Sequence, residues 1–338
     1  MTEHFVADRL IAWLYSEARE SFPYLFRLAT QRHGTQLLAY LNYEAPLLAR
    51  NASFTSLIAK LGIDQSECVR PLGRWPKLRE VFERQIRFWE VRPMPPMPSV
   101  VVSPSDSRVL FGRLQDRHDL PVKNKFFSFR ELIGENKVAW QSCFCDGDWA
   151  IFRLTPEKYH YNHLPVSGKV VDIYDVDGDF HSCNPSAVVR MVTSYSKNRR
   201  CITIIDTDVG GGSGVGFVAM IEVVALMIGE IVQCYSDEGY EDATPVRIGQ
   251  FVRRGAVKSL FRPGSSTVLL LFERQRVLFD YDLVKNARRH DVQSRFSYFF
   301  GESLVETDVS VRSSIGKALT RSLAEESVVP SRVQLETS

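Results

Sequence analysis

The chain has 338 residues, of which 42 are Lys or Arg and 40 are Asp or Glu, giving a formal net charge of +2. This balance argues against nucleic-acid binding, which needs a concentrated basic surface. An apolar content of 44% excludes a disordered chain and is enough for one large domain or two.

Helical periodicity dominates the first ninety residues. Over residues 6–18, one face is formed by Val6, Leu10, Ile11, Leu14 and Ala18. Breaks at Pro23 and Gly62 divide the residues that follow, and a further helix is predicted over 76–89. We therefore expect an N-terminal helical segment over residues 1–93. Its amphipathic first helix would either dock on a membrane or pack on the rest of the protein, and the sequence leaves both open.

The character of the chain changes at Pro93-Met-Pro-Pro-Met-Pro98, a run that cannot be helical and marks a domain boundary. Beyond it lie short segments rich in β-branched and aromatic residues, separated by turn residues. The predicted strands are 100–102, 109–112, 149–154, 169–174, 201–205, 217–225, 228–233 and 267–272, and the predicted helices are 128–132 and 186–195. Because helices are few and do not alternate with strands, we predict an α+β fold with an antiparallel-rich β domain over 99–320. The polar residues 321–338 are expected to form a flexible tail.

The cysteines and the apolar stretches bear on the compartment. Six cysteines are spread along the chain without the spacing of a disulfide framework, so we expect free thiols in a reducing compartment. The start, Met1-Thr-Glu-His, lacks the basic residues and apolar core of a signal peptide. The longest apolar stretch, 215–232, is interrupted by Glu222, Gly229 and Glu230, and therefore predicts paired strands and no transmembrane helix.

Three short motifs hold residues capable of chemistry, although each has an ordinary structural explanation. His160 and His163 stand three residues apart, but no third ligand has a convincing spacing, so no metal site is predicted. Gly264-Ser-Ser-Thr267 precedes an apolar strand and is, by itself, typical of a turn. Asp106, just after the proline-rich boundary, is equally typical of a turn aspartate.

Taken in order, these motifs resemble those of the pyruvoyl-dependent phosphatidylserine decarboxylases. The resemblance covers residues 20–316. The similar motifs are 102–109 (S-P-A-D-G-x-V in the family), 153–168 (R-L-x-P-x-D-Y-H-R-x-H-x-P-x-x-G), 198–200 (N-x-R), 225–229 (A-x-x-V-G), 255–261 (G-x-E-x-G-x-F) and 264–267 (the G-G-S-T cleavage site).

The resemblance implies that the chain cuts itself. Asp106, His163 and Ser266 match the family's Asp-His-Ser processing triad, in which His163 would accept the Ser266 hydroxyl proton and Asp106 would hold the imidazole. The freed oxygen would attack the carbonyl of residue 265, and elimination and hydrolysis would then convert Ser266 into a pyruvoyl group. A cut at Ser265-Ser266 would give chains of 265 and 73 residues (338 − 265).

The pyruvoyl group is the covalent cofactor that the resemblance implies. It would form a Schiff base with the amine of phosphatidylserine, or of another amine carboxylate, and accept electrons as carbon dioxide leaves. His160 would help to protonate the resulting carbanion. The implied enzyme is a carboxy-lyase of phospholipid biosynthesis, made of the two cleaved chains or a dimer of these. It would bind peripherally to the cytoplasmic side of a membrane.

Several positions depart from the family pattern. Ser265 replaces the Gly that precedes the scissile serine, so the cut could instead fall at Gly264-Ser265. Val257 and Ser259 replace the Glu and the second Gly of G-x-E-x-G, whereas the triad positions are retained. This drift leaves two alternatives open. One is decarboxylation of a soluble aromatic amino acid, and the other is a non-catalytic relative that binds an anionic headgroup without cutting itself.

Overall fold

The computed structural model describes residues 58–59, 62–71, 78–114, 127–188, 194–225, 230–262, 266–292, 294–300 and 303–319. The amphipathic helix predicted over 6–18, the tail predicted over 321–338 and both residues of the alternative cleavage site, Gly264-Ser265, lie outside these ranges. His160, His163, Asp106 and Ser266 lie within them.

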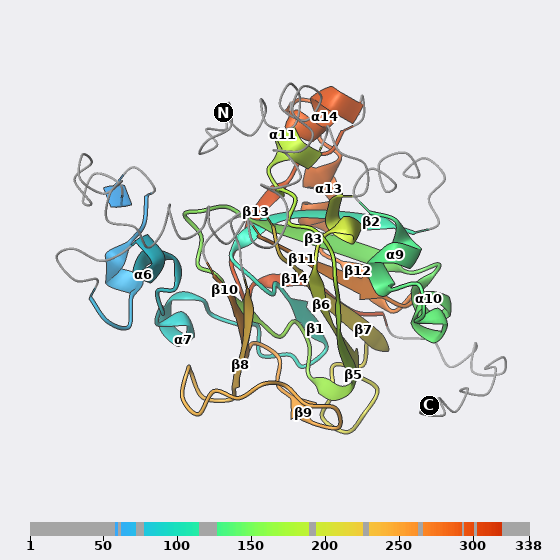
Figure 1. Cartoon of the computed structure of the whole chain (residues 1–338), viewed down its shortest axis with the longest axis horizontal. Coiled ribbons are helices and arrows are strands. Elements are labelled where there is room, and N and C mark those ends of the chain that lie inside the picture. The colour runs from blue at the N-terminus through green and yellow to red at the C-terminus, as the bar shows by residue number, and fades with distance from the viewer. Residues whose placement is uncertain are drawn as a thin grey trace.

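An eight-stranded sheet forms the centre of the fold (Figure 1). In order across the sheet its strands are β13 (Thr307–Val309), β2 (Ser107–Arg113), β3 (Asp148–Leu154), β11 (Ser266–Phe272), β7 (Phe217–Val223), β6 (Arg200–Asp206), β5 (Gly168–Val176) and β9 (Phe251–Val252). Every neighbouring pair is antiparallel. The predicted antiparallel-rich α+β fold is therefore confirmed.

Two three-stranded sheets pack on one face of this central sheet. One is β1 (Val100–Val102), β14 (Ser314–Ala318) and β12 (Val277–Phe279); the other is β4 (Tyr161–His163), β10 (Val257–Phe261) and β8 (Ile231–Ser236). Their apolar side chains share one buried cluster with Phe152, Val268 and Leu270 of the central strands. Since side chains alternate along a strand, the next residues of the same strands face the opposite side.

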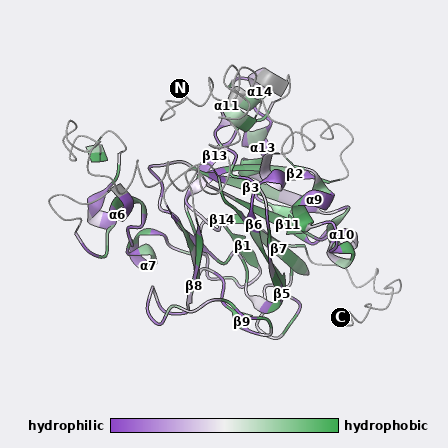
Figure 2. Ribbon diagram, viewed as in Figure 1, coloured by the Kyte–Doolittle hydropathy of each residue, from purple (hydrophilic) through white to green (hydrophobic). Residues whose placement is uncertain are grey.

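That opposite side is covered by short helices. Among the described residues, the helices with side chains in this second cluster are α9 (Phe129–Ile133), α10 (Val138–Phe144), α11 (Pro185–Val188), α12 (Ser194–Lys197) and α14 (Arg295–Phe300). Leu283 of α13 (Tyr281–Ala287) belongs instead to the cluster on the first face. Leu132, Trp140 and Phe296 from three of them are buried against Ile151 and Leu269 of the sheet. Figure 2 shows the hydrophobic residues concentrated on the central strands, which therefore have apolar neighbours on both faces.

The prediction of one continuous helix over 76–89 is wrong. Before the proline-rich run the structure has a 3-10 turn at Gln65–Glu67, α6 (Leu78–Phe82) and α7 (Phe88–Val91), and residues 83–87 between the two helices are not helical. Ile86 instead forms a β-bridge with Cys68, and its N–H and C=O both bond the hydroxyl of Tyr240, at 3.0 and 2.9 Å. These tertiary contacts occupy backbone groups that a continuous helix would use, and no local pattern could reveal them.

The eight predicted strands are all present, with differences of up to three residues at their ends, but six further strands within the described residues, β4, β9, β10, β12, β13 and β14, were not predicted. The helix predicted over 186–195 corresponds to α11 and α12, with 189–193 outside the described residues. All six cysteines are free. None of the helices in the described ranges is long and apolar enough to cross a membrane.

Candidate active site

Asp106 lies in the short loop between β1 and β2, and its carboxylate is buried. Ser103 stabilises the loop because its hydroxyl donates to the carbonyl of Ser105 at 2.8 Å. Oδ1 of Asp106 accepts the N–H of Val311 at 2.7 Å. The carboxylate is therefore held by backbone from the far end of the chain.

Arg92 provides the charge that balances Asp106. Its guanidinium lies 2.9 Å from Oδ2 of Asp106 and 2.9 Å from Oε1 of Glu67, so one cation bridges two carboxylates. Burial lowers the pKa of Arg92, but hydrogen bonds and attraction from Asp106 and Glu67 outweigh it and raise the pKa overall. Asp106 is thus paired with a permanent cation that follows α7.

His163 ends β4 and is fully buried. The backbone N–H of His163 donates to the carbonyl of Pro104 at 2.7 Å, so His163 lies beside the loop that holds Asp106. Nδ1 lies 2.9 Å from the carbonyl oxygen of Gly255, and Nε2 lies 3.1 Å from the hydroxyl of Tyr159. Burial lowers the pKa of His163 to about 4, while the Gly255 carbonyl and Asp106 act in the opposite direction.

The structure therefore brings Asp106 and His163 close together but does not join them. Among the described residues, no hydrogen bond links the Asp106 carboxylate to the imidazole, whose two nitrogens contact Gly255 and Tyr159. Asp106 acts on His163 through space. The triad predicted from the sequence stays a prediction.

His160 has a different environment. Its side chain is fully buried, its ring centroid lies 5.0 Å from that of Phe82, and neither ring nitrogen has a partner among the described residues. Burial, with a smaller contribution from Arg84, lowers the pKa of His160 to about 3. The imidazole is therefore neutral near pH 7, with a lone pair free to accept a proton.

Ser266 is the first residue of β11, in the middle of the central sheet. It pairs with Leu154 of β3, is fully buried, and its hydroxyl has no hydrogen-bond partner within the described part of the chain. The preceding strand, β10, pairs with His163 at Val257, and its last residue, Phe261, donates its N–H to the carbonyl of His160 at 3.0 Å. Phe261 is closer to Ser266 in the sequence than Val257 is. His160 therefore contacts the end of β10 from which the chain continues to Ser266.

Sequence reasoning missed a buried ion pair near Ser266. Glu222 on β7 pairs with Val268 on β11, and because side chains alternate, Ser266, Val268 and Glu222 share one face. Oε2 of Glu222 lies 2.5 Å from Nζ of Lys258, and both side chains are completely buried. Burial alone would lower the pKa of Lys258, but attraction from Glu222 outweighs it and raises the pKa. The sequence did contain a signal of this pair, because Glu222 is an acidic residue within the apolar stretch 215–232.

Polar neighbours complete the environment of this ion pair. The hydroxyl of Ser259 donates to Glu222, and Nδ2 of Asn162 donates to Ser259 at 3.0 Å. Lys258 also donates to Oε1 of Gln233 at 2.9 Å. Ser259 is one of the departures from the family pattern, and here its hydroxyl satisfies an acceptor that a glycine would leave without this donor.

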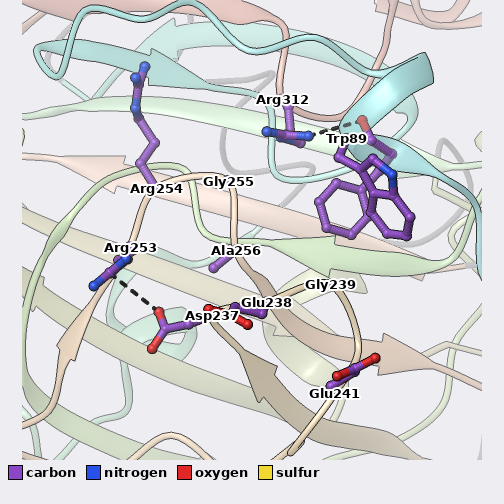
Figure 3. Close-up of a pocket in the computed structure, with 11 residues that line it drawn as sticks. Trp89, Asp237, Glu238, Gly239, Glu241, Arg253, Arg254, Gly255, Ala256 and Arg312 are labelled. Carbon is purple, nitrogen blue, oxygen red and sulfur yellow. Dashed lines mark hydrogen bonds and ion pairs between the residues drawn. The ribbon is translucent and has the colours of Figure 1, made fainter.

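A pocket of about 490 Å³ is lined in part by Gly255 and Phe88, two residues that contact His163 (Figure 3). Gly255, whose carbonyl contacts Nδ1 of His163, lies in its wall. The charged and aromatic side chains of the lining are Phe88, Trp89, Asp237, Glu238, Glu241, Arg253, Arg254 and Arg312. Figure 3 shows Arg253 directed toward Asp237, from which its Nε lies 3.7 Å away. The pocket presents both signs of charge next to an aromatic rim.

Comparison with known proteins decides the family. The family model for phosphatidylserine decarboxylase matches residues 78–305, a range that contains both histidines, Asp106 and Ser266. The chain belongs to the phosphatidylserine decarboxylase family. The family predicted from the sequence motifs is confirmed.

Individual relatives agree with this assignment. The chain is 33% identical over 231 residues to the phosphatidylserine decarboxylase proenzyme of Chlamydia muridarum, a match that covers 68% of this chain and 70% of the relative. It is 27% identical over 316 residues to the phosphatidylserine decarboxylase proenzyme of Clostridium tetani, covering 93% and 94%. The corresponding proenzyme of Fusobacterium nucleatum is 28% identical over 234 residues, covering 69% and 72%.

Proposed function

We propose that this protein is a self-processing phosphatidylserine decarboxylase, which releases carbon dioxide from phosphatidylserine and leaves phosphatidylethanolamine. Membership of the family, with a matched range that includes Ser266, carries the proposal. The relatives with which it aligns are phosphatidylserine decarboxylase proenzymes. This favours the lipid over a soluble aromatic amino acid as substrate.

The surroundings of Ser266 fit a residue that is to become a pyruvoyl group. A buried hydroxyl without a hydrogen-bond partner destabilises a fold, so its retention at the start of a central strand supports a chemical role. Backbone pairing with Leu154 of β3 would hold the group, with Glu222 on the same face. Once formed from Ser266, the pyruvoyl ketone would supply the electron-withdrawing centre that decarboxylation needs.

The proposed self-cleavage uses groups of the chain and one molecule of water. Ser266 loses its hydroxyl proton to an imidazole, and its oxygen attacks the carbonyl carbon of residue 265. The carbon–nitrogen bond breaks, the nitrogen takes up the proton, and an ester joins the two parts. Loss of the Cα proton of Ser266 and of the residue 1–265 carboxylate leaves a dehydroalanine. Addition of water and release of ammonia then give the ketone.

We assign the proton acceptor to His163 and the stabilising carboxylate to Asp106, with His160 acting in the decarboxylation step. The Pro104 contact with His163 and the through-space effect of Asp106 on its pKa support the pairing of these two residues. Because Tyr159 contacts Nε2 of His163, that contact must open before this nitrogen can take a proton from Ser266.

We also propose that the enzyme binds peripherally at the cytoplasmic face of a membrane. Trp89, which is 48% exposed, lies in the lining of the pocket beside His163, and exposed tryptophans favour membrane interfaces. The mixture of arginines and carboxylates in this lining suits a headgroup that carries phosphate, ammonium and carboxylate.

The substrate assignment is tested by measuring carbon dioxide from purified protein given either phosphatidylserine vesicles or free tryptophan. We expect release from the vesicles only, and none from a Ser266→Ala variant. Release from tryptophan alone would overturn the lipid assignment. If wild type and variant both remain intact and inactive, the protein is instead a non-catalytic relative.

A further inference from the structure

Arg312, in the turn between β13 and β14, has a strained backbone. Its φ angle of 69° lies in the left-handed region, which favours glycine and is unfavourable for a residue with a side chain. The N–H of Arg312 donates to the carbonyl of Ser103 at 2.9 Å. The N–H of Val311 donates to Oδ1 of Asp106 at 2.7 Å, so the turn is fixed against the loop that holds Asp106. Strain retained in this way is a reason to look for a function of the side chain.

The guanidinium of Arg312 lacks a counter-charge within the described part of the chain. Its Nη1 donates to the carbonyl oxygen of Phe88 at 2.9 Å, its Nε is buried without a partner, and it forms no ion pair with a described carboxylate. Burial lowers the pKa of Arg312, and the charged side chain that adds to this effect is Arg254, a second cation. Since arginine stays protonated in proteins, Arg312 is a half-buried cation with unused N–H donors.

The pocket of about 490 Å³ gives an anion access to this cation, because Arg312, Phe88 and Gly255 all line it. The guanidinium lies over the ring of Phe88, 5.0 Å from its centroid, and the same ring packs against the imidazole of His163, with centroids 4.6 Å apart. A Cβ on Gly255 would come within 3.2 Å of Nε of Arg312, so the glycine leaves room for the guanidinium. Arg312 therefore lines the pocket close to the proposed base.

The carboxylates of the pocket lie on a different wall. Asp237, Glu238 and Glu241 belong to the loop after β8, and Figure 3 shows them apart from Arg312. Asp237 has Arg253 as its partner at 3.7 Å, whereas Glu238 and Glu241 form no ion pair with a described residue. Charge complementarity thus favours an occupant with an anionic group at the Arg312 end and an ammonium group at the other.

We propose that Arg312 binds the phosphodiester of the phosphatidylserine headgroup in this pocket. Phosphate oxygens accept charge-assisted hydrogen bonds from a guanidinium, often two at once. The headgroup carboxylate is a poorer partner, because a cation beside it would stabilise the ground state of the group that has to leave as carbon dioxide. The phosphodiester keeps its charge throughout the reaction. This inference rests on the proposed function, since the headgroup is that of the proposed substrate.

The pocket would also depend on both products of the proposed cleavage. Arg312 follows the cut before Ser266, and all the other lining residues precede it. The anion-binding side chain would therefore be supplied by the 266–338 chain and the rest of the lining by the 1–265 chain.

Calorimetric titration of the uncleaved Ser266→Ala protein tests the site. The probes are glycerophosphoserine, which is the headgroup without acyl chains, inorganic phosphate and free serine. We expect glycerophosphoserine to bind, and Arg312→Gln to weaken this binding about tenfold or more, as the loss of a charge-assisted hydrogen bond does. Free serine lacks the phosphate, so its affinity should not respond to Arg312→Gln.

Two further variants serve as controls. Arg289→Gln removes the same charge at an exposed position, where Arg289 pairs with Asp291 at 2.6 Å, and should leave the affinity unchanged. Arg312→Gly separates binding from folding, because glycine adopts a φ of 69° without strain. We expect Arg312→Gly to unfold at a temperature no lower than Arg312→Gln does, and to lose affinity for glycerophosphoserine to the same extent.

The proposal is overturned if glycerophosphoserine does not bind the Ser266→Ala protein at millimolar concentration, or if both Arg312 variants bind it as tightly as their parent. Equal losses in Arg289→Gln, or for free serine, would also overturn it. Tighter binding of inorganic phosphate than of glycerophosphoserine would assign Arg312 to free phosphate and overturn the headgroup as its ligand. A wild-type chain that fails to cleave would contradict the proposed function alone, because the titration uses an uncleaved protein.

Discussion

At the scale of single residues, His160 and His163 differ in what surrounds them although they stand three positions apart. We expect His163→Ala to stop self-cleavage, because the proposed base is lost. His160→Ala should still be cleaved but release carbon dioxide at least about 100-fold more slowly, the usual contribution of an acid–base group. Denaturing electrophoresis measures the first effect and carbon dioxide release the second. If His160→Ala fails to cleave and His163→Ala still cleaves, the assignment is wrong, and His160 is the residue needed for cleavage.

Burial of His160 also predicts a pH dependence of stability. Its pKa is about 3 in the folded protein and about 6.5 in an unfolded chain, so the unfolded state binds the extra proton between these values. The contribution of His160 to the free energy of unfolding is therefore constant above about pH 6.5 and falls by up to about 1.4 kcal/mol per pH unit below it.

Urea unfolding of the Ser266→Ala protein at pH 7, 6 and 5 measures this slope. A His160→Leu variant should reduce it, leaving the contribution of the buried His163, and substitution of the exposed His290 by Gln should leave it unchanged. An identical slope in all three proteins would show that His160 is not held neutral by the fold.

The ion pair between Lys258 and Glu222 allows a double-mutant test at the same scale. Lys258→Met leaves Glu222 buried and unpaired, and we expect a loss of about 3–5 kcal/mol in the free energy of unfolding. Replacing both residues by Met should recover much of this loss, since a buried pair can be exchanged for apolar groups. Additive effects of the two substitutions would argue against the pairing.

At the scale of elements, the turn before β3 determines how closely this strand approaches β11. A Cβ on Gly147 would lie 1.8 Å from the carbonyl oxygen of Phe272, which is backbone and cannot move aside, whereas a Cβ on Gly210 would meet nothing within 4 Å. We expect Gly147→Ala to lower the free energy of unfolding by about 1–3 kcal/mol. Gly210→Ala should change it by less than about 0.5 kcal/mol. Thermal unfolding of the two variants provides the comparison, and equal midpoints would contradict this packing.

The same scale shows how far the sequence could predict the fold. The apolar strands β3, β6, β7 and β11 follow the expected pattern closely. β4 and β10 were missed because their buried faces hold polar side chains, among them His163 and Lys258, which cancel the apolar signal. Motif resemblance predicted Ser266 and both histidines as site residues, which periodicity could not do. It could not indicate that Tyr240, from a distant loop, contacts Tyr159, since only the fold brings the two together.

At the scale of the whole molecule, the cut before Ser266 would separate two parts that are interleaved. β11 would belong to the 266–338 chain, yet it pairs on both sides with strands of the 1–265 chain, β3 and β7. Arg153 and Glu306, one in each part, form a buried ion pair at 2.5 Å. We therefore expect the two chains to stay associated after cleavage, as one compact molecule.

The intact mass of the purified wild-type protein tests self-cleavage at Ser266 most directly. Under denaturing conditions the account predicts two species, residues 1–265 and a 73-residue chain (338 − 265) that is lighter by one ammonia than the same peptide beginning with serine. Under native conditions it predicts one complex of both. A single species of 338 residues, or a Ser266→Ala variant that fragments as the wild type does, would contradict it.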